Sequence, residues 1–381
     1  MAINPTQQPR RPRIAVTFGD AAGIGPELIA KLLSNPENLE KADILLLGDR
    51  SELTSAIADA GGVHVPVSDV AGPQSVQVLD DQTAARYPVE RGAVSKAGGE
   101  RCLYQFRRGL EMARKGEVDA IVFGPLNKSS LKLAGMTEED ELRWFAKQLD
   151  FTGTTSEINI APGMLWTARV TSHIGIEKVA AQITKENTIK AIELLNRLRY
   201  VYPSDTGLLT NIFLRWESGI EHPRLGVCAL NPHNGENGSF GRQEIDAIAP
   251  AVATARANGI DVEGPFPCDT IFLKRNRYDG IVTMYHDQGQ IALKLLSFEG
   301  GVTVQGGLPV VISTPAHGTA FDIAGQNLAS VTSTQSAFDI AVTMAGRRIS
   351  KQHGTDGSVY ASSLQTKLLP KVTAVEVHSC C

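Results

Sequence analysis

The chain has 381 residues, of which 42% are hydrophobic and 20% are charged. This composition is typical of a globular protein and argues against disorder, and the length suffices for two domains. The formal net charge of −4 gives no general support for nucleic acid or an anionic membrane as partner. No apolar run is long enough to span a membrane, and the polar, proline-containing start lacks the apolar segment of a secretory signal.

The cysteines are few and scattered, and none forms a C-x-x-C pair. They are Cys102, Cys228, Cys268, Cys380 and Cys381. An odd, dispersed set argues against a disulfide framework or a zinc knuckle, and favours a reducing compartment. We therefore expect a cytoplasmic protein.

Short β-branched runs alternate with helical patterns along the chain. The predicted strands cover 13–18, 43–47, 120–123, 164–171, 225–230 and 280–284. The predicted helices begin at Pro26 and Ser51 or cover 96–115, 243–257 and 336–345, with one more from about Asp287. Such alternation predicts parallel strands and an α/β fold. The stretch 200–218 fits neither pattern, so it is either an inserted loop at a subunit contact or an extra helix.

A glycine-rich loop, residues 19–27 (GDAAGIGPE), follows the first predicted strand and opens the first predicted helix. Its glycines permit a tight turn, and a helix N-terminus reached in this way can hold an anion. The loop does not match G-x-G-x-x-G, so an ordinary Rossmann fingerprint is not supported. A plain turn between strand and helix explains the residues equally simply.

Three histidines follow predicted strands: His173, His233 and His286. The carboxyl ends of parallel strands form the ligand crevice of α/β sheets, so the three imidazoles can converge on one ion. Imidazole nitrogen suits zinc and other divalent transition metals. Each histidine taken alone has an equally good structural explanation, because spacing this long is not a metal motif.

Lysines and a second glycine-containing loop complete the candidates. Lys294 lies two helical turns after His286, and Lys128 follows a predicted strand. Either lysine would offer a point charge to a carboxylate or phosphate, or would simply be a solvated surface residue. The loop 317–325 (HGTAFDIAG) has small residues that suit the approach of a flat ligand, or it is a structural loop.

At this point the chain resembles the 4-hydroxythreonine-4-phosphate dehydrogenase family of NAD-dependent enzymes. The matching stretches are AVTFGDAAGIGPE, VDAIVFGPLNK, ALNPHNGENGSFGRQEID, GPFPCDTIF, MYHDQGQIALK and HGTAFDIAG. They occur in the family's order between about residues 13 and 346, and the last one is also similar to the cofactor loop of isocitrate and isopropylmalate dehydrogenases.

The resemblance implies a three-layer α/β/α subunit of the isocitrate/isopropylmalate dehydrogenase type, with two domains around a cleft. The first domain would comprise 13–130 plus 300–350 and the second 131–299, with tails at 1–12 and 351–381. It also implies a homodimer with its active site at the interface. There, His173, His233 and His286 would bind a divalent metal, one of them donated across the interface. The metal is expected to be zinc, with magnesium, manganese, cobalt and iron as alternatives.

The resemblance further implies that NAD, or NADP, lies along the loop that begins at His317. The cofactor-binding residues would be His317, Gly318, Thr319, Ala320, Asp322, Gly325 and Asn327. Lys294 would reach the substrate, and Lys294, Lys128 and Asp287 are the candidates for proton transfer or orientation. Asp269 is a weaker candidate, as a carboxylate behind a histidine ligand.

The substrate positions depart from the family pattern. A family Gly-His-Thr-Glu run corresponds to Asp140-Glu141-Leu142-Arg143 here, and the family's phosphate-binding asparagine and arginine correspond to Thr303 and Ile312. Isoleucine cannot replace a bidentate phosphate partner, and Glu141 would repel a phosphate. The expected substrate-binding residues are those that occupy the family's substrate positions, whatever their side chains: Glu141, Leu142, Arg143, Lys294, Thr303 and Ile312.

Two substrate classes follow from this pattern. One is 4-hydroxythreonine-4-phosphate, with oxidation of a hydroxyl beside a carboxylate-bearing carbon and then decarboxylation. The other is implied by a resemblance of the run KLLSFEGGVTVQGGLPVVISTPAHG to another branch of the same family. Members of that branch dehydrogenate an unphosphorylated terephthalate-type cis-dihydrodiol dicarboxylate, whose carboxylate Arg143 would meet. An acyl or phosphoryl transferase and a non-catalytic binding protein are more distant alternatives, because a fold does not fix a function.

Overall fold

A computed structural model describes residues 10–197 and 223–352. The stretch 200–218, the last two cysteines and nearly all of both predicted tails lie outside these residues. No helix within the described ranges is long and apolar enough to cross a membrane.

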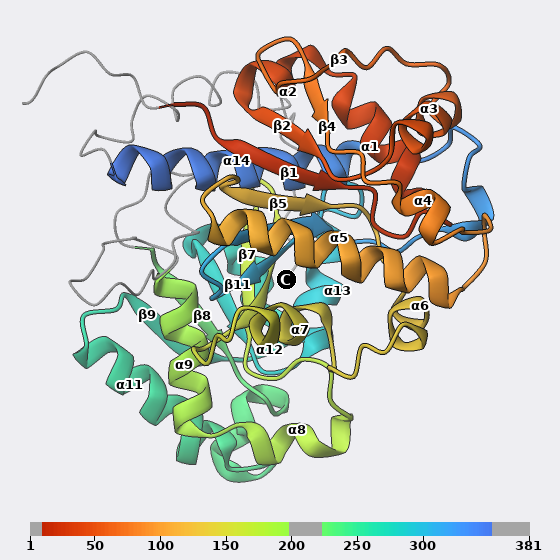
Figure 1. Ribbon diagram of the computed structural model, residues 1–381. Helices are drawn as coiled ribbons and strands as arrows, with labels where there is room; N and C mark the ends of the chain where they lie inside the picture. The colour runs from red at the N-terminus through yellow and green to blue at the C-terminus, as the bar shows by residue number, and fades with distance from the viewer. Residues whose placement is uncertain (1–9, 198–222, 353–381) are drawn as a thin grey trace, which may run out of the picture.

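The described chain contains twelve strands and helices that alternate with them (Figure 1). The strands are β1 (Arg13–Thr17), β2 (Asp43–Leu46), β3 (Val67–Ser68), β4 (Val76–Val78), β5 (Ala120–Phe123), β6 (Ser156–Ala161), β7 (Leu165–Arg169), β8 (Leu225–Cys228), β9 (Val262–Phe266), β10 (Gly280–Thr283), β11 (Val302–Gly306) and β12 (Val311–Pro315). The α-helices are α1 (Gly25–Leu33), α2 (Pro36–Lys41), α3 (Arg50–Asp59), α4 (Thr83–Arg86), α5 (Lys96–Arg114), α6 (Lys128–Leu133), α7 (Glu141–Gln148), α8 (Ile176–Gln182), α9 (Lys185–Arg197), α11 (Ala249–Ala257), α12 (Cys268–Ile271), α13 (His286–Leu296) and α14 (Thr332–Gln352). Four shorter turns are η1 (Pro232–Gly238), η2 (Glu244–Ile248), η3 (Phe272–Arg277) and η4 (Phe321–Ile323).

All twelve strands form one sheet, in the order β3-β4-β2-β1-β5-β12-β11-β6-β7-β10-β8-β9. The six strands from β3 to β12 are parallel, as are the four from β7 to β9. Between these blocks, β12, β11, β6 and β7 pair antiparallel. Three antiparallel steps reverse the direction, so the two parallel blocks run in opposite directions within one sheet. The predicted two-domain division, which remains a prediction, would separate β11 from β6.

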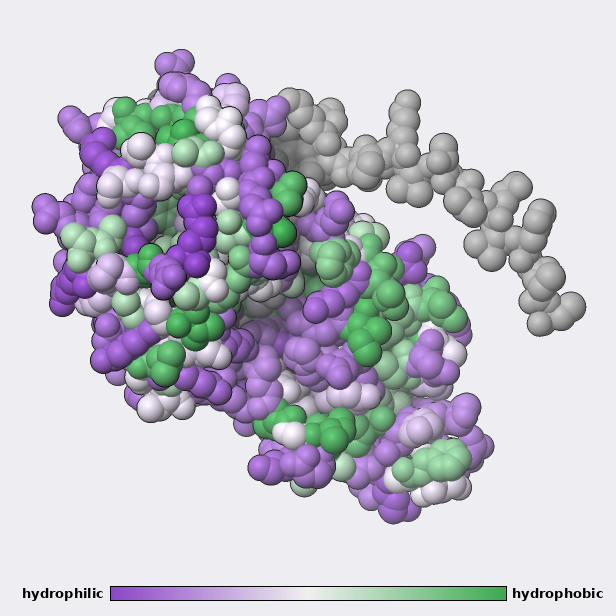
Figure 2. All heavy atoms as spheres, turned by 90° about the vertical axis from the view of Figure 1, so that its right-hand side faces the viewer, coloured by the Kyte–Doolittle hydropathy of each residue, from purple (hydrophilic) through white to green (hydrophobic). Residues whose placement is uncertain are grey.

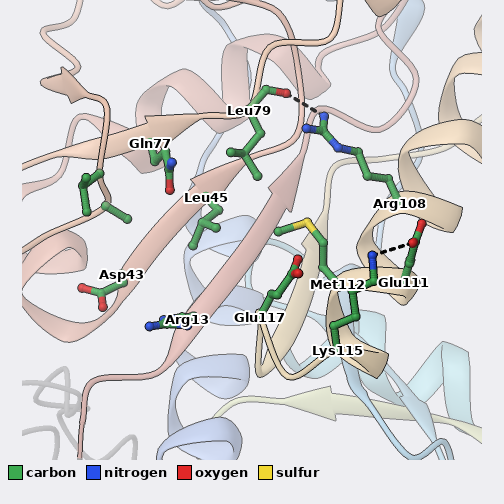
Figure 3. A pocket seen from close by; sticks show the side chains of 12 residues that line it. Arg13, Asp43, Leu45, Gln77, Leu79, Arg108, Glu111, Met112, Lys115 and Glu117 are labelled. Atoms are coloured by element: carbon green, nitrogen blue, oxygen red, sulfur yellow. Dashed lines mark hydrogen bonds and ion pairs between the residues drawn. The ribbon is translucent and has the colours of Figure 1, made fainter.

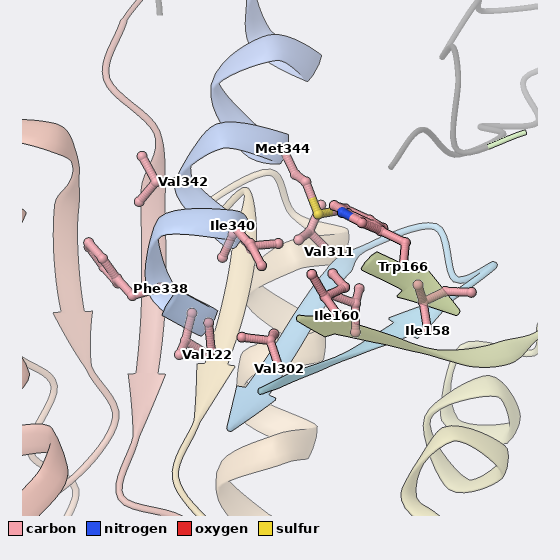
Figure 4. Close-up of a cluster of buried hydrophobic side chains, with 14 of the residues drawn as sticks. Val122, Ile158, Ile160, Trp166, Val302, Val311, Phe338, Ile340, Val342 and Met344 are labelled. Carbon is pink, nitrogen blue, oxygen red and sulfur yellow. The ribbon is translucent and has the colours of Figure 1, made fainter. Parts of the chain in front are cut away.

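Successive side chains along the inner strands point to opposite faces of the sheet and pack into separate hydrophobic clusters. Ile14 and Val16 of β1 belong to the larger cluster, whereas Ala15 between them belongs to the cluster beneath α5. The larger cluster joins the sheet to α1, α3, α9, α11 and α14, and Figure 4 shows its part under α14, with Phe338 and Met344. On the other face, α5 and α7 pack in one cluster and α12 and α13 in another. Helices therefore cover both faces, which confirms the predicted three-layer α/β/α fold.

The predicted strands and helices are confirmed in position, but the sequence patterns missed the short strands β3 and β4 as well as β6, β9, β11 and β12. The strand β9 carries a proline, Pro265, which removes a ladder donor and hides the strand from a pattern search. It is tolerated because β9 is an edge strand of the sheet. The strands β6 and β11 carry polar residues on one face, and those residues prove to line a cavity.

Candidate active site

A cavity of about 300 Å³ lies where the two parallel blocks of the sheet meet. It is lined by Phe123, Pro125, Leu126, Lys128, Glu141, Glu157, His173, His286, Gln290, Lys294, Thr303, Gln305, Thr314, Pro315, Ala316, His317 and Gly318. One block contributes the segments that follow β5 and β12, and the other contributes the segments that follow β7 and β10. Eight of the predicted site residues therefore share one cavity: Lys128, Glu141, His173, His286, Lys294, Thr303, His317 and Gly318.

Two of the three predicted metal-binding histidines lie together in this cavity. His173 follows β7 and His286 opens α13 directly after β10, and β7 and β10 are parallel neighbours. Their ring centroids are 5.6 Å apart. Each Nδ1 faces a carboxylate, that of Asp140 at 3.0 Å and that of Asp287 at 2.7 Å. Both rings thus keep Nε2 for a ligand, and this donor set fits a divalent metal.

His233 also follows a strand of the same parallel block, because β8 pairs with β10. Its loop, however, carries a run of left-handed residues from His233 to Asn237. The buried carboxylate of Glu244 holds the start of this loop by accepting from the N–H groups of Leu230 and Asn231 at 2.8 Å. The His233 ring is exposed, lies 6.3 Å from the Phe240 ring, and does not line the cavity.

The protonation state of the histidine site suits a metal. Burial lowers the pKa of His286, and it outweighs the opposing hydrogen bond with Asp287. Burial alone would raise the pKa of Asp140, but hydrogen bonds from His173 and the Arg143 backbone hold it below its ordinary value. Neutral imidazole is the form that binds metal, so the lowered pKa of His286 favours a loaded site. The lowered pKa of Asp140 keeps an ionised acceptor facing Nδ1 of His173.

Two lysines and a buried glutamate face one another across the cavity. The ammonium nitrogen of Lys128 lies 4.0 Å from Oε2 of Glu141. Glu141 is only 8% exposed, and burial raises the pKa of its carboxyl. Lys294 lies on α13 two turns beyond His286 and lines the same cavity, as its spacing predicted. The cavity thus offers two cations to an anionic substrate and one carboxyl group that is readily protonated.

Several polar residues of the cavity escaped the sequence analysis. Glu157 of β6 and Gln305 of β11 are paired across the two strands, and both are buried. Glu157 forms a buried ion pair with Arg169, and Oε1 of Gln305 has no hydrogen-bond partner. The ligand atoms of Asp140, Glu157 and His173 lie within 4.8 Å of one another. The sequence did contain a signal for these residues: polar residues alternate along β6 and β11, whereas inner strands are usually apolar.

The predicted cofactor loop follows β12 and is fixed to the glycine-rich loop after β1. The carbonyl of Thr319 accepts from the N–H of Ile24 at 2.9 Å. The buried carboxylate of Glu27 accepts from the N–H groups of Asn327 at 3.1 Å and Ala329 at 2.8 Å. Gly23 allows the contact, because a Cβ there would lie 2.5 Å from the Thr319 carbonyl oxygen. The two loops are therefore one packed unit, from which His317 and Gly318 enter the cavity.

Three of the expected substrate contacts need correction, because their side chains point elsewhere. Leu142 and Ile312 are 2% and 0% exposed and belong to the hydrophobic cluster beneath α5. Arg143 is exposed, donates to the Thr155 hydroxyl at 2.9 Å, and does not line the cavity. Leu142 and Ile312 lie on the buried sides of α7 and β12, and a side chain packed in a hydrophobic cluster cannot also face a polar site.

Asp287 and Asp269 line a separate groove of about 410 Å³ behind the histidines, between α12, η3 and α13. A third hollow, of about 600 Å³, lies between β2, β4 and α5 (Figure 3). Its lining charges are of both signs and partly paired: Arg108 donates to the Leu79 carbonyl at 2.6 Å, and Lys115 to Glu111 at 2.7 Å. It contains none of the predicted site residues.

Comparison with known proteins agrees with the resemblance seen in the sequence. The family described as "Pyridoxal phosphate biosynthetic protein PdxA" matches residues 40–341. A putative 4-hydroxythreonine-4-phosphate dehydrogenase 2 of Pseudomonas aeruginosa is 47% identical, over 88% of this chain and 98% of the relative. The crystal structure of 4-hydroxythreonine-4-phosphate dehydrogenase from Klebsiella pneumoniae is similar with a TM-score of 0.72 at 32% identity, covering 89% and 99% of the two chains.

The terephthalate branch matches less well. The structure of a terephthalate 1,2-cis-dihydrodiol dehydrogenase from Burkholderia xenovorans has a TM-score of 0.58 and 27% identity, covering 88% of this chain and 98% of its own. Both values lie below those of the Klebsiella structure, so the dihydrodiol alternative is not favoured.

Proposed function

Because this chain belongs to the PdxA family and is a dehydrogenase that acts on a CH–OH group, we propose that it oxidises a small phosphorylated hydroxy acid of the 4-hydroxythreonine-4-phosphate type. NAD would supply the hydride acceptor when bound, and the β-keto acid product would then lose carbon dioxide. The observation that carries the proposal is the single cavity shared by His173, His286, two lysines and the start of the cofactor loop.

The metal site of this proposal consists of His173 and His286 of one chain and His233 of the partner subunit. Zinc is the proposed ion, because an all-imidazole donor set suits it. A divalent ion held there would lower the pKa of the substrate hydroxyl and stabilise the enolate formed as carbon dioxide leaves. The exposed position of His233, away from its own chain's cavity, supports donation between subunits.

The proposed NAD site follows the loop from His317 to Asn327, with NAD rather than NADP as cofactor. Its residues are His317, Gly318, Thr319, Ala320, Asp322, Gly325 and Asn327. Burial lowers the pKa of His317, which favours a neutral imidazole at the start of this loop. Asp322 is exposed and free to accept hydrogen bonds from ribose hydroxyls. The packing of this loop on the glycine-rich loop holds these groups in a fixed orientation.

Lys128 and Lys294 bind the anionic ends of the substrate in this proposal. They replace the arginine that the family uses, because Ile312 occupies its position and lies in the core. Thr303 and Gln305 of β11 also line the cavity and offer it neutral hydrogen-bonding groups. A lysine could take the hydroxyl proton only as the neutral amine, so a lysine that pairs with an anionic end would not also be the base. Asp287 orients His286 through the hydrogen bond to its Nδ1.

The proposed assembly is a homodimer that forms through the face of α13 opposite the cavity. Three apolar side chains are largely exposed there: Ile291 at 59%, Leu295 at 83% and Leu273, on η3, at 79%. Together with the groove beside them, they form a continuous apolar surface next to His286. Figure 2 shows one face of the molecule, on which several clusters of hydrophobic side chains lie among hydrophilic ones. A second copy that covers the apolar surface would bring its own loops close to the histidines.

The proposal is tested by His286→Ala, with NADH formation from 4-phosphohydroxythreonine as the readout. We expect the rate of the variant to be more than about 100-fold below that of the wild type, because the metal loses a ligand. A chelator should abolish the wild-type reaction, and NAD and zinc should each raise the melting temperature of the wild-type protein. Activity of the variant in the presence of chelator would disprove the metal site. A melting temperature unmoved by either ligand would support a non-catalytic binding protein instead.

A further inference from the structure

Asp140 lies between the start of α7 and the histidine that follows β7. We propose that Asp140 is the positioning residue of His173: it fixes the ring and its tautomer so that Nε2 is free to bind the metal. This inference rests on the proposed function, since it concerns the same metal site, and it gives a role at the metal to a residue that the sequence placed only in the substrate run.

The two carboxylate oxygens of Asp140 have two different partners. Oδ1 caps α7 by accepting from the N–H of Arg143 at 2.8 Å, and Oδ2 lies 3.0 Å from Nδ1 of His173. The Asp140 side chain is 4% exposed, whereas that of His173 is 25% exposed. A buried carboxylate therefore holds a partly open imidazole, and the cap prevents the carboxylate from turning away.

The chemistry of this contact selects one tautomer. A carboxylate accepts but does not donate, so Nδ1 of His173 must carry the hydrogen, and in the neutral ring Nε2 then presents its lone pair. A carboxylate behind a histidine ligand also raises the basicity of that ligand. The hydroxyl of Ser172 is the other neighbour of Nδ1, but at 3.5 Å it lies at the limit of a hydrogen bond.

The corresponding pair of His286 and Asp287 is less buried and less constrained. Asp287 is the next residue in the chain, and its side chain is 68% exposed, so solvent screens and competes with its contact. Asp140 reaches its histidine from another element, 33 residues away in sequence, and does so in a buried setting. Of the two carboxylates, Asp140 therefore has the larger expected effect on metal affinity.

The test compares Zn²⁺ affinity, by chelator competition, in the full-length wild type, Asp140→Asn and Asp140→Ser. Both variants keep an oxygen that caps α7, but neither offers a second oxygen to Nδ1. In Asp140→Asn the amide N–H₂ faces Nδ1 instead, which favours the hydrogen on Nε2 and blocks the metal. Asn35→Ser, which changes the cap of α2 far from the cavity, is the matched control.

We expect Asp140→Asn and Asp140→Ser each to bind Zn²⁺ about 10–100-fold more weakly than the wild type. Asn35→Ser should bind it equally well. The absorption spectrum of the Co²⁺-loaded variants should also differ from that of the loaded wild type, and the metal-free variants should melt within a few degrees of it. Wild-type affinity in both Asp140 variants would overturn the inference and leave the proposed function intact. A wild-type protein that binds neither Zn²⁺ nor Co²⁺ would overturn the proposed metal site, and this inference with it.

Discussion

Single buried charges set the chemistry of the cavity. Glu141 and Glu157 are both 8% exposed, yet only Glu157 has a cation at hydrogen-bond distance, in Arg169. Lys128 is 4.0 Å from Glu141, too far to offset the cost of burial, and the pKa of Glu141 is raised accordingly. A buried carboxylate that lacks a close partner costs stability whenever it is ionised.

This reasoning predicts the effect of Glu141→Gln on stability. Because burial raises the folded-state pKa of Glu141, the folded protein binds more protons than the unfolded one above the ordinary pKa of about 4.3. The wild-type free energy of unfolding must therefore fall as the pH rises from the ordinary pKa of a glutamate to the raised pKa of Glu141. We expect the variant to be more stable by on the order of 1 kcal/mol at neutral pH, and equal to the wild type near pH 4. Urea unfolding at several pH values measures this, and a variant less stable at neutral pH would contradict it.

At the scale of single residues, the sequence predicted which residues belong to the site better than it predicted which way their side chains point. His173, His286 and Lys294 were singled out because they follow strand ends or keep a helical spacing, but His233, which also follows a strand, does not line the cavity. Arg143, Leu142 and Ile312 were expected to contact substrate from their places in family motifs, but which way a side chain points depends on packing. Asp140 was not predictable, because its contact joins residues 33 positions apart on separate elements.

Among the elements, the most consequential contact joins the loop after β1 to the loop after β12. Glu27 at the start of α1 is 1% exposed, and its carboxylate accepts from two backbone N–H groups of the second loop. Lys31, one turn later, neutralises that carboxylate at 2.8 Å. The glycine-rich loop therefore acts here by holding the cofactor loop. Among its glycines, Gly23 permits this close approach, whereas Gly19, at a φ of +70°, packs against the backbone of Gly124.

Gly23→Ala tests this packing. The added Cβ would lie 2.5 Å from the carbonyl oxygen of Thr319, so the cofactor loop must move. We expect a loss of stability of about 1–3 kcal/mol and a higher KM for NAD. Gly72→Ala is the control, because a Cβ there meets only the Ser75 hydroxyl at 3.7 Å. Steady-state kinetics with NAD as the varied substrate measure the effect, and an unchanged KM in Gly23→Ala would contradict the proposed role of the loop.

For the whole molecule, alternation of strands and helices was enough to predict the α/β class and its parallel blocks. The antiparallel centre was not predictable, because β6 and β11 are inner strands with a polar face and so lack the expected apolar run. That polar face exists because the cavity lies on it. The order of strands was likewise hidden, since β11 and β12 return from the end of the chain to the middle of the sheet.

The proposed dimer predicts complementation between two inactive variants. If His233 is donated to the partner, a mixed dimer of His233→Ala and His286→Ala contains one site with both mutations and one with neither. Mixing the unfolded chains and refolding them together should restore up to about a quarter of the wild-type rate, since half of the dimers are mixed and each has one intact site. Refolding each variant alone is the control. No recovery in the mixture would place His233 in its own chain's site or outside the site.

The most direct test of the central claim is NADH formation by the wild-type protein, with and without zinc. The substrates are 4-phosphohydroxythreonine, four-carbon acid phosphates and an aromatic cis-dihydrodiol dicarboxylate. The cavity with two histidines, two lysines and the cofactor loop predicts NADH formation from a phosphorylated acid that depends on added metal. No NADH from any phosphorylated acid, or an equal rate in the presence of a chelator, would contradict the account.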